Sequence, residues 1–387
     1  LVFLVDVSGS MQEENKLPLV KTSLKILVDQ LRPQDRVALV VYAGNAGLVL
    51  PSTPGDQKMK IKNAIDELEA GGSTAGAEGI KLAYQVARQN FATEGNNRVI
   101  IATDGDFNVG MSSDDELVRL IEKEKKGNIF LTVLGYGMGN YKDEKMQQLA
   151  DKGNGNHAYI DNENEAKKVL STEFEGTLFT IAKDVKIQVE FNPAKVQSYR
   201  LIGYENRMLK KEDFNNDAKD AGELGAGHRV TALYEVIPAG VKDEFTSSVD
   251  PLKYQSNITS GIDNNTEELM TIKLRYKKPD EETSKLIVHP VVDEHINLTA
   301  TSDNFRFSAA VAAFGMLLRN SAYKQNTTYN DVIIMAEKAK GSDKDGYRKE
   351  FVELVNEAAV LAKSSLLVWR LSGQFRRAPK PRHTCVN

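Results

Sequence analysis

The chain has 387 residues, of which 41% are hydrophobic and 27% are charged, and its formal net charge at pH 7 is −4. This composition is typical of globular proteins with cores of ordinary size, and it excludes the basic surface that nucleic-acid binding requires, so we expect no nucleic-acid partner. The single cysteine, Cys385, excludes an intramolecular disulfide and a zinc site built from cysteines.

Short runs of Val, Ile and Leu alternate with amphipathic stretches in the first half of the chain. The runs are almost continuously apolar, as expected for strands of a sheet that is covered on both faces. We expect strands at LVFLVDV, RVALVVYA, RVIIATD and NIFLTVLGYG. Between them, apolar residues spaced three and four apart, such as Leu17, Val20 and Leu24, predict helices. The alternation predicts an α/β fold over residues 1–181: a doubly wound, mainly parallel sheet flanked by helices.

The hydrophobic period changes after this region. DVKIQVEFNP, HRVTALYEVIP and LMTIKLRYKK alternate apolar and polar residues with a period of two, which predicts an antiparallel β domain over residues 182–303. Residues 238–268 are polar and rich in turn-forming residues, so we expect a long surface loop there. A helical period returns at NFRFSAAVAAFGMLLRNS and predicts a helical region over residues 304–375, followed by a basic tail over residues 376–387.

Two of the expected strands end in an aspartate, Asp6 and Asp104. In a doubly wound sheet, ligands bind beyond the carboxyl ends of the strands, and a carboxylate there needs water, a partner or a metal ion to compensate its charge. Ser8 and Ser10 follow Asp6 at alternate positions, so an extended loop would aim both hydroxyl groups the same way as the carboxylate. We therefore expect the oxygen atoms of these side chains to converge.

A third stretch, EAGGSTAGAEGI, is a glycine-flanked loop that presents another hydroxyl group just before an expected helix. The full set of expected metal ligands is Asp6, Ser8, Ser10, Thr74 and Asp104. Hard oxygen donors of this kind suit Mg²⁺, with Mn²⁺ or Ca²⁺ as alternatives. Because Mg²⁺ takes six ligands and often takes some of them from a partner, an Asp or Glu of a protein partner would complete the shell. The alternative without a metal is a turn and a helix cap, which Asp and Ser also favour.

The motifs DVSGS, GGST and TDGD resemble the metal-ion-dependent adhesion site of von Willebrand factor type A domains, and the resemblance covers about residues 1–180. It is specific, because three separated segments occur in the right order and on the expected elements. It implies a mostly parallel sheet with the metal at its top, held by the five residues named above, and a module that binds protein partners without catalysis. Asp106, in the same loop as Asp104, is a candidate for contacting the ligands of the metal.

The rest of the chain resembles bacterial envelope proteins in which such a domain precedes an uncharacterised carboxyl-terminal region. This resemblance implies a location in the bacterial cell envelope or outside the cell, with a lipid anchor on a segment upstream of this sequence, which begins within a strand and is expected to be a fragment. No apolar run reaches the length of a membrane span, and the longest, FSAAVAAFGMLLR, is expected to be a core helix. Nothing in the sequence indicates the oligomeric state.

Two other functions stay open beside a binding module without enzymatic activity. A metal-dependent phosphoesterase would use Asp6 as a nucleophile or as a metal base, but Ser8 stands where a second acid is needed, and we find no lysine or histidine placed as a general acid. A scaffold subunit of an envelope complex would use the metal to regulate conformation. By analogy with the family, the change would pass through the last helix of the first domain, at about residues 163–180.

Two further motifs have weaker patterns. GYGMG, at residues 135–139, lacks the full G-x-G-x-x-G pattern of a dinucleotide-binding loop, and we interpret it as a strand-to-loop turn. The stretch HPVVDEH has the side chains of a transition-metal site but not the H-E-x-x-H spacing, and we interpret its residues as ordinary surface or core residues. Its candidate ligands are His289, Asp293, Glu294 and His295.

Overall fold

The computed structural model describes residues 1–73, 76–105, 114–138, 141–173, 176, 180–204, 208–241, 266–279 and 281–371. The chain divides into two compact units. The first comprises residues 1–188, 209–229 and 273–288, and the second comprises residues 189–208, 230–272 and 289–387. The predicted tail at 376–387 and most of the predicted surface loop at 238–268 lie outside the described residues.

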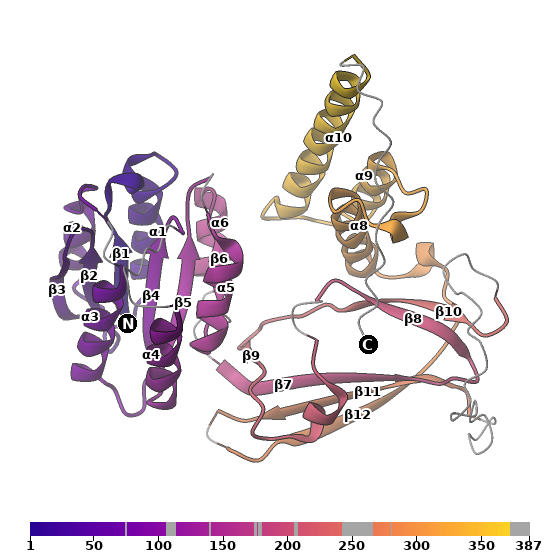
Figure 1. The fold of residues 1–387 in the computed structure, drawn as a ribbon, viewed down its shortest axis with the longest axis horizontal. Coiled ribbons are helices and arrows are strands. Elements are labelled where there is room, and N and C mark those ends of the chain that lie inside the picture. Colours follow the sequence, from indigo (N-terminus) through magenta and orange to yellow (C-terminus); the bar gives the residue numbers. More distant parts are fainter. Residues whose placement is uncertain are drawn as a thin grey trace. The chain divides into compact units, whose positions relative to one another are not determined.

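A six-stranded sheet forms the centre of the first unit, with the strand order β3-β2-β1-β4-β5-β6 (Figure 1). Its strands are β1 (Val2–Asp6), β2 (Arg36–Tyr42), β3 (Ala46–Pro54), β4 (Asn97–Thr103), β5 (Ile129–Gly135) and β6 (His157–Tyr159). Neighbouring strands are parallel except β2 and β3, which are antiparallel. This arrangement confirms the predicted doubly wound, mainly parallel sheet.

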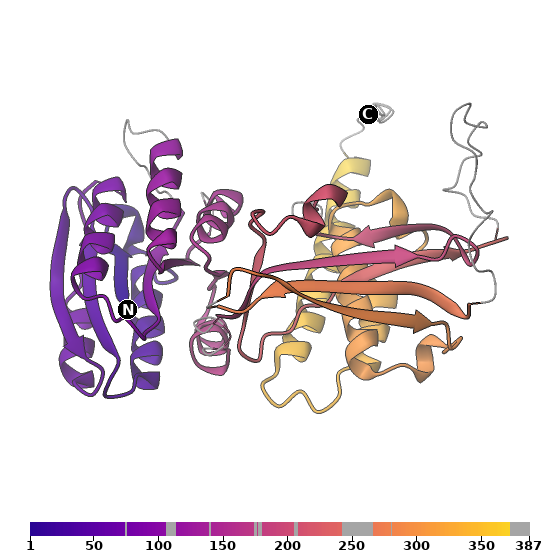
Figure 2. The same ribbon diagram turned by 90° about the horizontal axis from the view of Figure 1, so that it is seen from below.

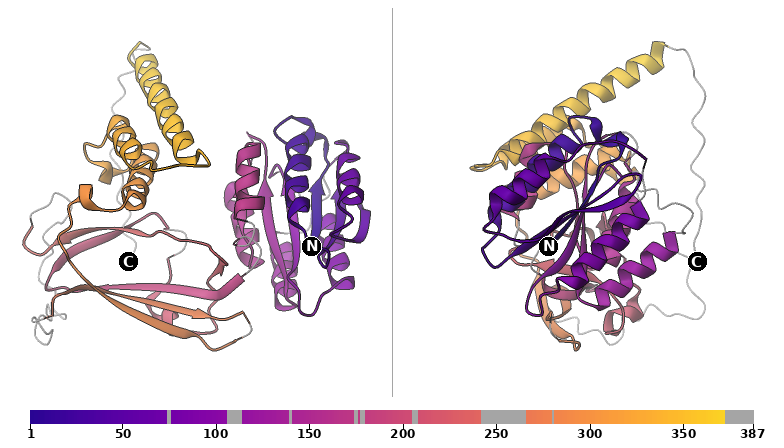
Figure 3. Two further views of the ribbon diagram at one scale, coloured as in Figure 1. Left: turned by 180° about the vertical axis from the view of Figure 1, so that it is seen from behind. Right: turned by 90° about the vertical axis from the view of Figure 1, so that its left-hand side faces the viewer.

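Helices cover both faces of this sheet (Figures 1 and 3). They are α1 (Leu17–Gln30), α2 (Lys58–Asp66), α3 (Gly76–Gln89), α4 (Asp114–Lys126), α5 (Asp143–Lys152) and α6 (Glu163–Lys167), which continues as a π-helical turn at Lys168–Thr172. Neighbouring residues of β1 pack into opposite cores: Phe3 and Val5 belong to the core that includes α1, whereas Leu4 belongs to the core that includes α3. A strand that is buried on both faces is apolar throughout, which explains the continuous runs in the sequence.

The chain beyond the first sheet forms antiparallel β structure, as predicted. One sheet has the order β12-β11-β7-β9 and contains β7 (Thr180–Phe191), β9 (Gly222–Gly225), β11 (Glu268–Lys277) and β12 (Lys285–Val292). A second sheet pairs β8 (Val196–Ile202) with β10 (Leu233–Pro238). The long strands β7 and β11 run side by side (Figure 2). Because β7, β11 and β12 each contain residues of both units, the predicted limits of the domains stay predictions.

The described part of the predicted helical region contains three α-helices: α8 (Asp303–Leu318), α9 (Tyr329–Lys338) and α10 (Tyr347–Leu371). Polar caps start two of them, since Ser302 accepts a hydrogen bond from the backbone of Phe305, and Thr328 forms a capping box with Asp331. Short 3₁₀-helices lie at Gly9–Gln12, Lys211–Asn215, Leu298–Ala300 and Ala322–Lys324. No described helix combines the length and the hydrophobicity that crossing a membrane requires.

Candidate functional site

The candidate site lies where the strand order of the first sheet reverses direction. β1 pairs with β2 on one side and with β4 on the other. β2 and β3 therefore lie on one side of β1, and β4, β5 and β6 lie on the opposite side. The loops after β1 and β4 therefore diverge, and the crevice between such loops is where doubly wound sheets bind ligands. Asp6 ends β1 and Asp104 directly follows β4, as predicted.

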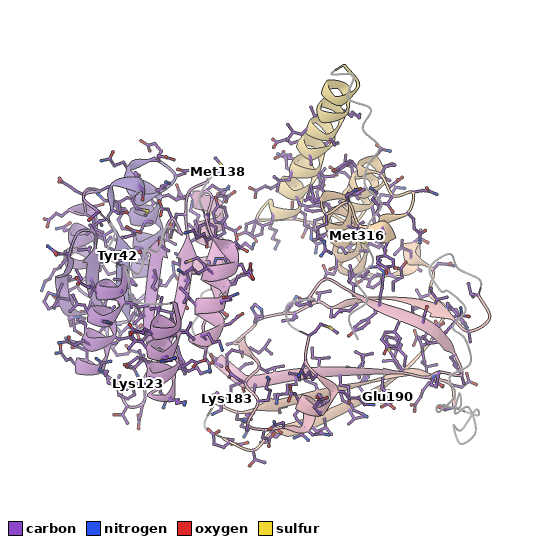
Figure 4. The ribbon with its side chains drawn as sticks, in the orientation of Figure 1. Tyr42, Lys123, Met138, Lys183, Glu190 and Met316 are labelled. Carbon is purple, nitrogen blue, oxygen red and sulfur yellow. The ribbon has the colours of Figure 1, made fainter. Side chains whose placement is uncertain are left out.

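Asp6 is completely buried, and three hydrogen bonds hold its carboxylate. Its Oδ1 accepts from the backbone N–H of Ser8 at 2.9 Å. Its Oδ2 accepts from the hydroxyl groups of Tyr42 at 3.0 Å and Thr103 at 3.2 Å, Tyr42 being the last residue of β2 (Figure 4). Burial raises the pKa of Asp6, hydrogen bonds from Ser8 and Tyr42 oppose this rise, and the charge of nearby Asp104 adds to it. A cation between the two carboxylates would relieve their repulsion.

The hydroxyl oxygens of Ser8 and Ser10 lie 3.1 Å apart. Neighbouring ligands of an octahedral Mg²⁺ ion, each about 2.1 Å from the metal, are about 3.0 Å apart, so the two hydroxyl groups fit adjacent positions around one ion. The backbone corrects the prediction of an extended loop, since Ser8 is extended but Gly9 begins a 3₁₀-helix. The reason is Met11, whose N–H donates to the Ser8 carbonyl at 3.0 Å and whose side chain is fully buried in the core.

The third predicted segment docks against this turn through its backbone. The N–H of Gly9 donates to the carbonyl of Gly72 at 3.0 Å, and a Cβ atom at position 9 would lie 3.4 Å from the same oxygen. The hydrogen bond between Gly9 and Gly72 therefore holds the loop containing Ser73 beside the turn after β1. Thr74 and Asp106 lie outside the described residues, so their roles stay predictions.

Lys16 is a residue of this site that the sequence analysis missed. Its Nζ donates to Oδ2 of Asp104 at 3.2 Å and to the backbone carbonyl of Ser10 at 2.9 Å. The side chains of Lys16 and Asp104 are only 10% and 6% exposed, so they form a buried ion pair. The sequence analysis found no lysine placed as a general acid, and the structure places Lys16 beside Asp104 as the partner in an ion pair. A signal was available, because Lys16 lies four residues before the buried Val20 and so continues the inward face of α1.

The side chains at this site fit a divalent cation. Asp6 and Asp104 carry two negative charges, Lys16 supplies one positive charge, and the serine hydroxyl groups are neutral donors. Hard oxygen donors with a net negative charge suit Mg²⁺, Mn²⁺ or Ca²⁺. Within the described part of the chain, no group of three or more His, Cys, Asp or Glu side chains could hold a metal ion.

The two weaker motifs have ordinary surroundings. His295 is 87% exposed, and its Nδ1 lies 3.1 Å from Oδ2 of Asp293, which agrees with the interpretation of HPVVDEH as ordinary residues. In GYGMG, Gly135 ends β5 and Gly137 has a φ of +76°. The hydroxyl group of Tyr159 donates to the carbonyl of Gly137 at 2.5 Å. The described part of this motif is thus a strand-to-loop turn, as interpreted.

Residues 1–173 match the family model of the von Willebrand factor type A domain, and residues 176–361 match the model described as "Uncharacterized protein YfbK, C-terminal". The chain is 45% identical over 358 residues to the uncharacterized protein YfbK of Escherichia coli (strain K12); the match covers 92% of this chain and 61% of that protein. The chain therefore spans less than two thirds of the length of this relative. It is 28% identical over 166 residues to the uncharacterized protein sll0103 of Synechocystis, covering 43% of this chain and 38% of that protein.

Two solved structures are similar to parts of this chain. A von Willebrand factor type A protein from Catenulispora acidiphila gives a TM-score of 0.45 at 16% identity, covering 90% of this chain and 81% of that one. Proximal thread matrix protein 1 from the mussel byssus, in a structure with a zinc-occupied metal-ion-dependent adhesion site, gives a TM-score of 0.36 at 23% identity. That match covers 44% of this chain and 43% of the mussel protein.

Proposed function

Residues 1–173 of this chain form a von Willebrand factor type A domain, and from this premise we propose that the protein is a metal-dependent binding module for adhesion or assembly. Its ligand is the carboxylate of an Asp or Glu on a protein partner. The observation that carries the proposal is the meeting of Asp6, Ser8, Ser10 and Asp104 at the carboxyl edge of the sheet, where two hydroxyl oxygens lie 3.1 Å apart.

The residues would hold the cation in different ways. Domains of this family commonly bind a divalent metal at this motif, and we propose Mg²⁺, with Mn²⁺ or Ca²⁺ as alternatives. The predicted ligands Asp6, Ser8, Ser10, Thr74 and Asp104 would supply the oxygen atoms. Asp6 also fixes the backbone of Ser8 through its hydrogen bond. When bound, the ion supplies a positive charge with which the carboxylate of the partner pairs. Neutral hydroxyl ligands leave more of that charge unneutralised than additional carboxylates would.

We do not propose a catalytic role for this site. The phosphoesterase alternative needs Asp6 as a nucleophile or metal base, but both of its oxygens accept hydrogen bonds and the residue is completely buried. Lys16 is engaged by Asp104 and by the carbonyl of Ser10. Turnover of a generic phosphate ester that disappears in Asp6→Asn would contradict the proposal of a binding module.

We place the protein in the bacterial cell envelope or outside the cell, with a lipid anchor on an upstream segment. The support is the order of the two domains, since a type A domain followed by an uncharacterised carboxyl-terminal domain resembles bacterial envelope proteins. The 45% identical relative is also bacterial. Fractionation of cells that produce the full-length protein tests this location, and recovery in the cytosol alone would contradict it.

The experiment that tests the proposed function is replacement of Asp104 by alanine. We expect Asp104→Ala to lose Mg²⁺ binding in calorimetry, and to lose Mg²⁺-dependent capture of partners from an envelope extract, while circular dichroism stays unchanged. Asp29→Ala is a matched control, because Asp29 is an exposed aspartate of α1 that pairs with Lys62. Equal Mg²⁺ affinity in both variants would overturn the proposal.

A second candidate, a scaffold with a metal-regulated conformation, is favoured by a contact at the end of the domain. A Cβ atom on Gly225 would lie 1.7 Å from the carbonyl oxygen of Gly176, so the backbone at Gly176 packs tightly against the end of β9. The π-helical turn at Lys168–Thr172 precedes this contact, and such turns are frequent at functional sites. Hydrogen exchange over residues 163–185 with Mg²⁺ and with chelator tests this candidate; identical exchange would contradict it.

A further inference from the structure

Lys16 joins three loops around the candidate site. Its ammonium group bonds to the Ser10 carbonyl in the loop after β1 and to Asp104 in the loop after β4. In the loop after β5, a Cβ atom on Gly137 would lie 2.5 Å from Cε of Lys16, so this loop packs against the stem of the lysine. The positive charge is therefore held in a defined place beside two of the predicted metal ligands.

This placement is unfavourable for the helix that follows. Lys16 is the N-cap residue of α1 and makes no side-chain cap hydrogen bond. Its charge lies at the end of the helix where the exposed N–H groups already create a positive potential, which favours anions. The ammonium group is also largely removed from water, and burying a charge costs free energy unless the charge is paired. Since Lys16 breaks two local rules beside a site, we expect it to serve the site rather than the helix.

The charges at the site show what Lys16 changes. We count the charges of Asp6, Asp104 and Lys16 and leave out Glu13, a 67% exposed carboxylate that lies 3.9 Å from Nζ of Lys16. The two aspartates and Lys16 leave one net negative charge, a divalent cation would make this group positive by one, and a partner carboxylate would make it neutral. Without Lys16, the empty site would carry two negative charges and the cation alone would neutralise it. The lysine thus opposes the cation and favours the anion, because its charge acts on both at short range in a partly buried place.

We propose that Lys16 is a specificity-determining residue of this site, whose ammonium group weakens cation binding and makes the loaded site selective for an anionic group. This inference rests on the proposed function, because it takes the cation to bind at Asp104. It assigns to Lys16 a contribution to the recognition of the partner carboxylate that the neutral ligands cannot supply. A lysine that only pins the loops together would contribute stability and have no such effect on selectivity.

The test measures Mn²⁺ binding by electron paramagnetic resonance in matched variants, with acetate as the carboxylate probe and chloride at equal ionic strength as its control. Lys16→Met and Lys16→Gln remove the charge, and Lys16→Arg keeps it. Lys21→Met is the control, since Lys21 also lies on α1 and its Nζ contacts the carbonyl of Asp66 at an exposed position. Thermal unfolding of each variant shows that the fold is intact.

We expect the uncharged variants to bind Mn²⁺ roughly ten- to a hundredfold more tightly than the unmodified chain in chloride. We also expect acetate to increase the Mn²⁺ affinity of the unmodified chain and of Lys16→Arg, and to do so much less in Lys16→Met and Lys16→Gln. An Mn²⁺ affinity that is unchanged or weaker in both folded variants Lys16→Met and Lys16→Gln would overturn the inference. In that case the proposed function would still stand if Asp104→Ala loses Mn²⁺ binding. If Asp104→Ala keeps its Mn²⁺ binding, the proposed function and this inference both fail.

Discussion

The hydroxyl group of Tyr42, at the end of β2, donates to Oδ2 of Asp6, at the end of the neighbouring strand β1, over 3.0 Å. Both residues are fully buried, so this bond stabilises a charge that has little contact with water. We predict that Tyr42→Phe lowers the free energy of unfolding by about 1.5–3 kcal/mol, as expected for a lost hydrogen bond to a charged group. Urea denaturation measures this, with Tyr199→Phe, at a 57% exposed position, as the control. Equal stability of the two variants would contradict the prediction.

The loop that carries Asp104 requires glycine at position 105. Gly105 has a φ of +83°, and a Cβ atom there would lie 2.7 Å from Cδ2 of Tyr141. We predict that Gly105→Ala lowers the free energy of unfolding by about 2–3 kcal/mol, from the left-handed backbone and the clash together, and weakens Mn²⁺ binding. Gly203→Ala isolates the backbone effect, since Gly203 has a φ of +79° and no described atom within 4 Å of an added Cβ. A loss of stability as small as that in Gly203→Ala would show that the clash is absent.

Two neighbouring residues of the third predicted segment, Ser73 and Thr74, have hydroxyl groups, and mutation of each shows which one is the metal ligand. Thr74 is the predicted ligand, whereas the Oγ atom of Ser73 lies 3.5 Å from where a Cβ atom of Gly44 would stand, beside the turn between β2 and β3. We predict that Thr74→Ala weakens Mn²⁺ binding at least about tenfold, as expected for loss of a ligand atom, and that Ser73→Ala changes it little. Calorimetry of both variants measures this. The reverse order of effects would assign the ligand role to Ser73 instead.

The half-buried acid Glu223 on β9 predicts how stability depends on pH. Burial raises the pKa of Glu223 from 4.5 to about 8, so between these values the folded chain holds a proton that the unfolded chain releases. Stability therefore falls as the pH rises through this window. We predict that Glu223→Gln exceeds the unmodified chain in stability by about 2–4 kcal/mol at pH 9 and matches it near pH 4. Denaturation across this pH range measures the difference; a difference that is constant with pH would contradict the assigned cause.

The strands of the first sheet could be predicted because burial on two faces leaves a strong signal. Phe3 and Leu4 lie in opposite cores, so β1 is apolar from Val2 to Val5, and the change to a polar residue at Asp6 marks the carboxyl edge. The three-residue β6 lacks this signal, since each of its residues is half-buried. The helix α2 gives only a weak pattern, with Ile61 and Ile65 as its buried residues.

The candidate site could be predicted as far as its residues follow strand ends. Asp6 and Asp104 were found because parallel strands place their carboxyl ends at one edge of the sheet. Lys16 was missed because its partner lies 88 residues away. Its place before Val20 indicates an inward side chain, but no local pattern of the sequence shows which residue it contacts. The 3₁₀ turn after Ser8 was missed for a similar reason, since burial of Met11 in the core determines it.

The central claim is that one cation binds between the loops after β1 and β4. The most direct test is a crystal structure of the protein soaked in Mn²⁺, with the anomalous scattering of manganese recorded. The account predicts an anomalous peak about 2.0–2.3 Å from the Oγ atoms of both Ser8 and Ser10, and its absence in Asp104→Ala crystals. A soaked crystal with no peak beside these two serines would contradict it.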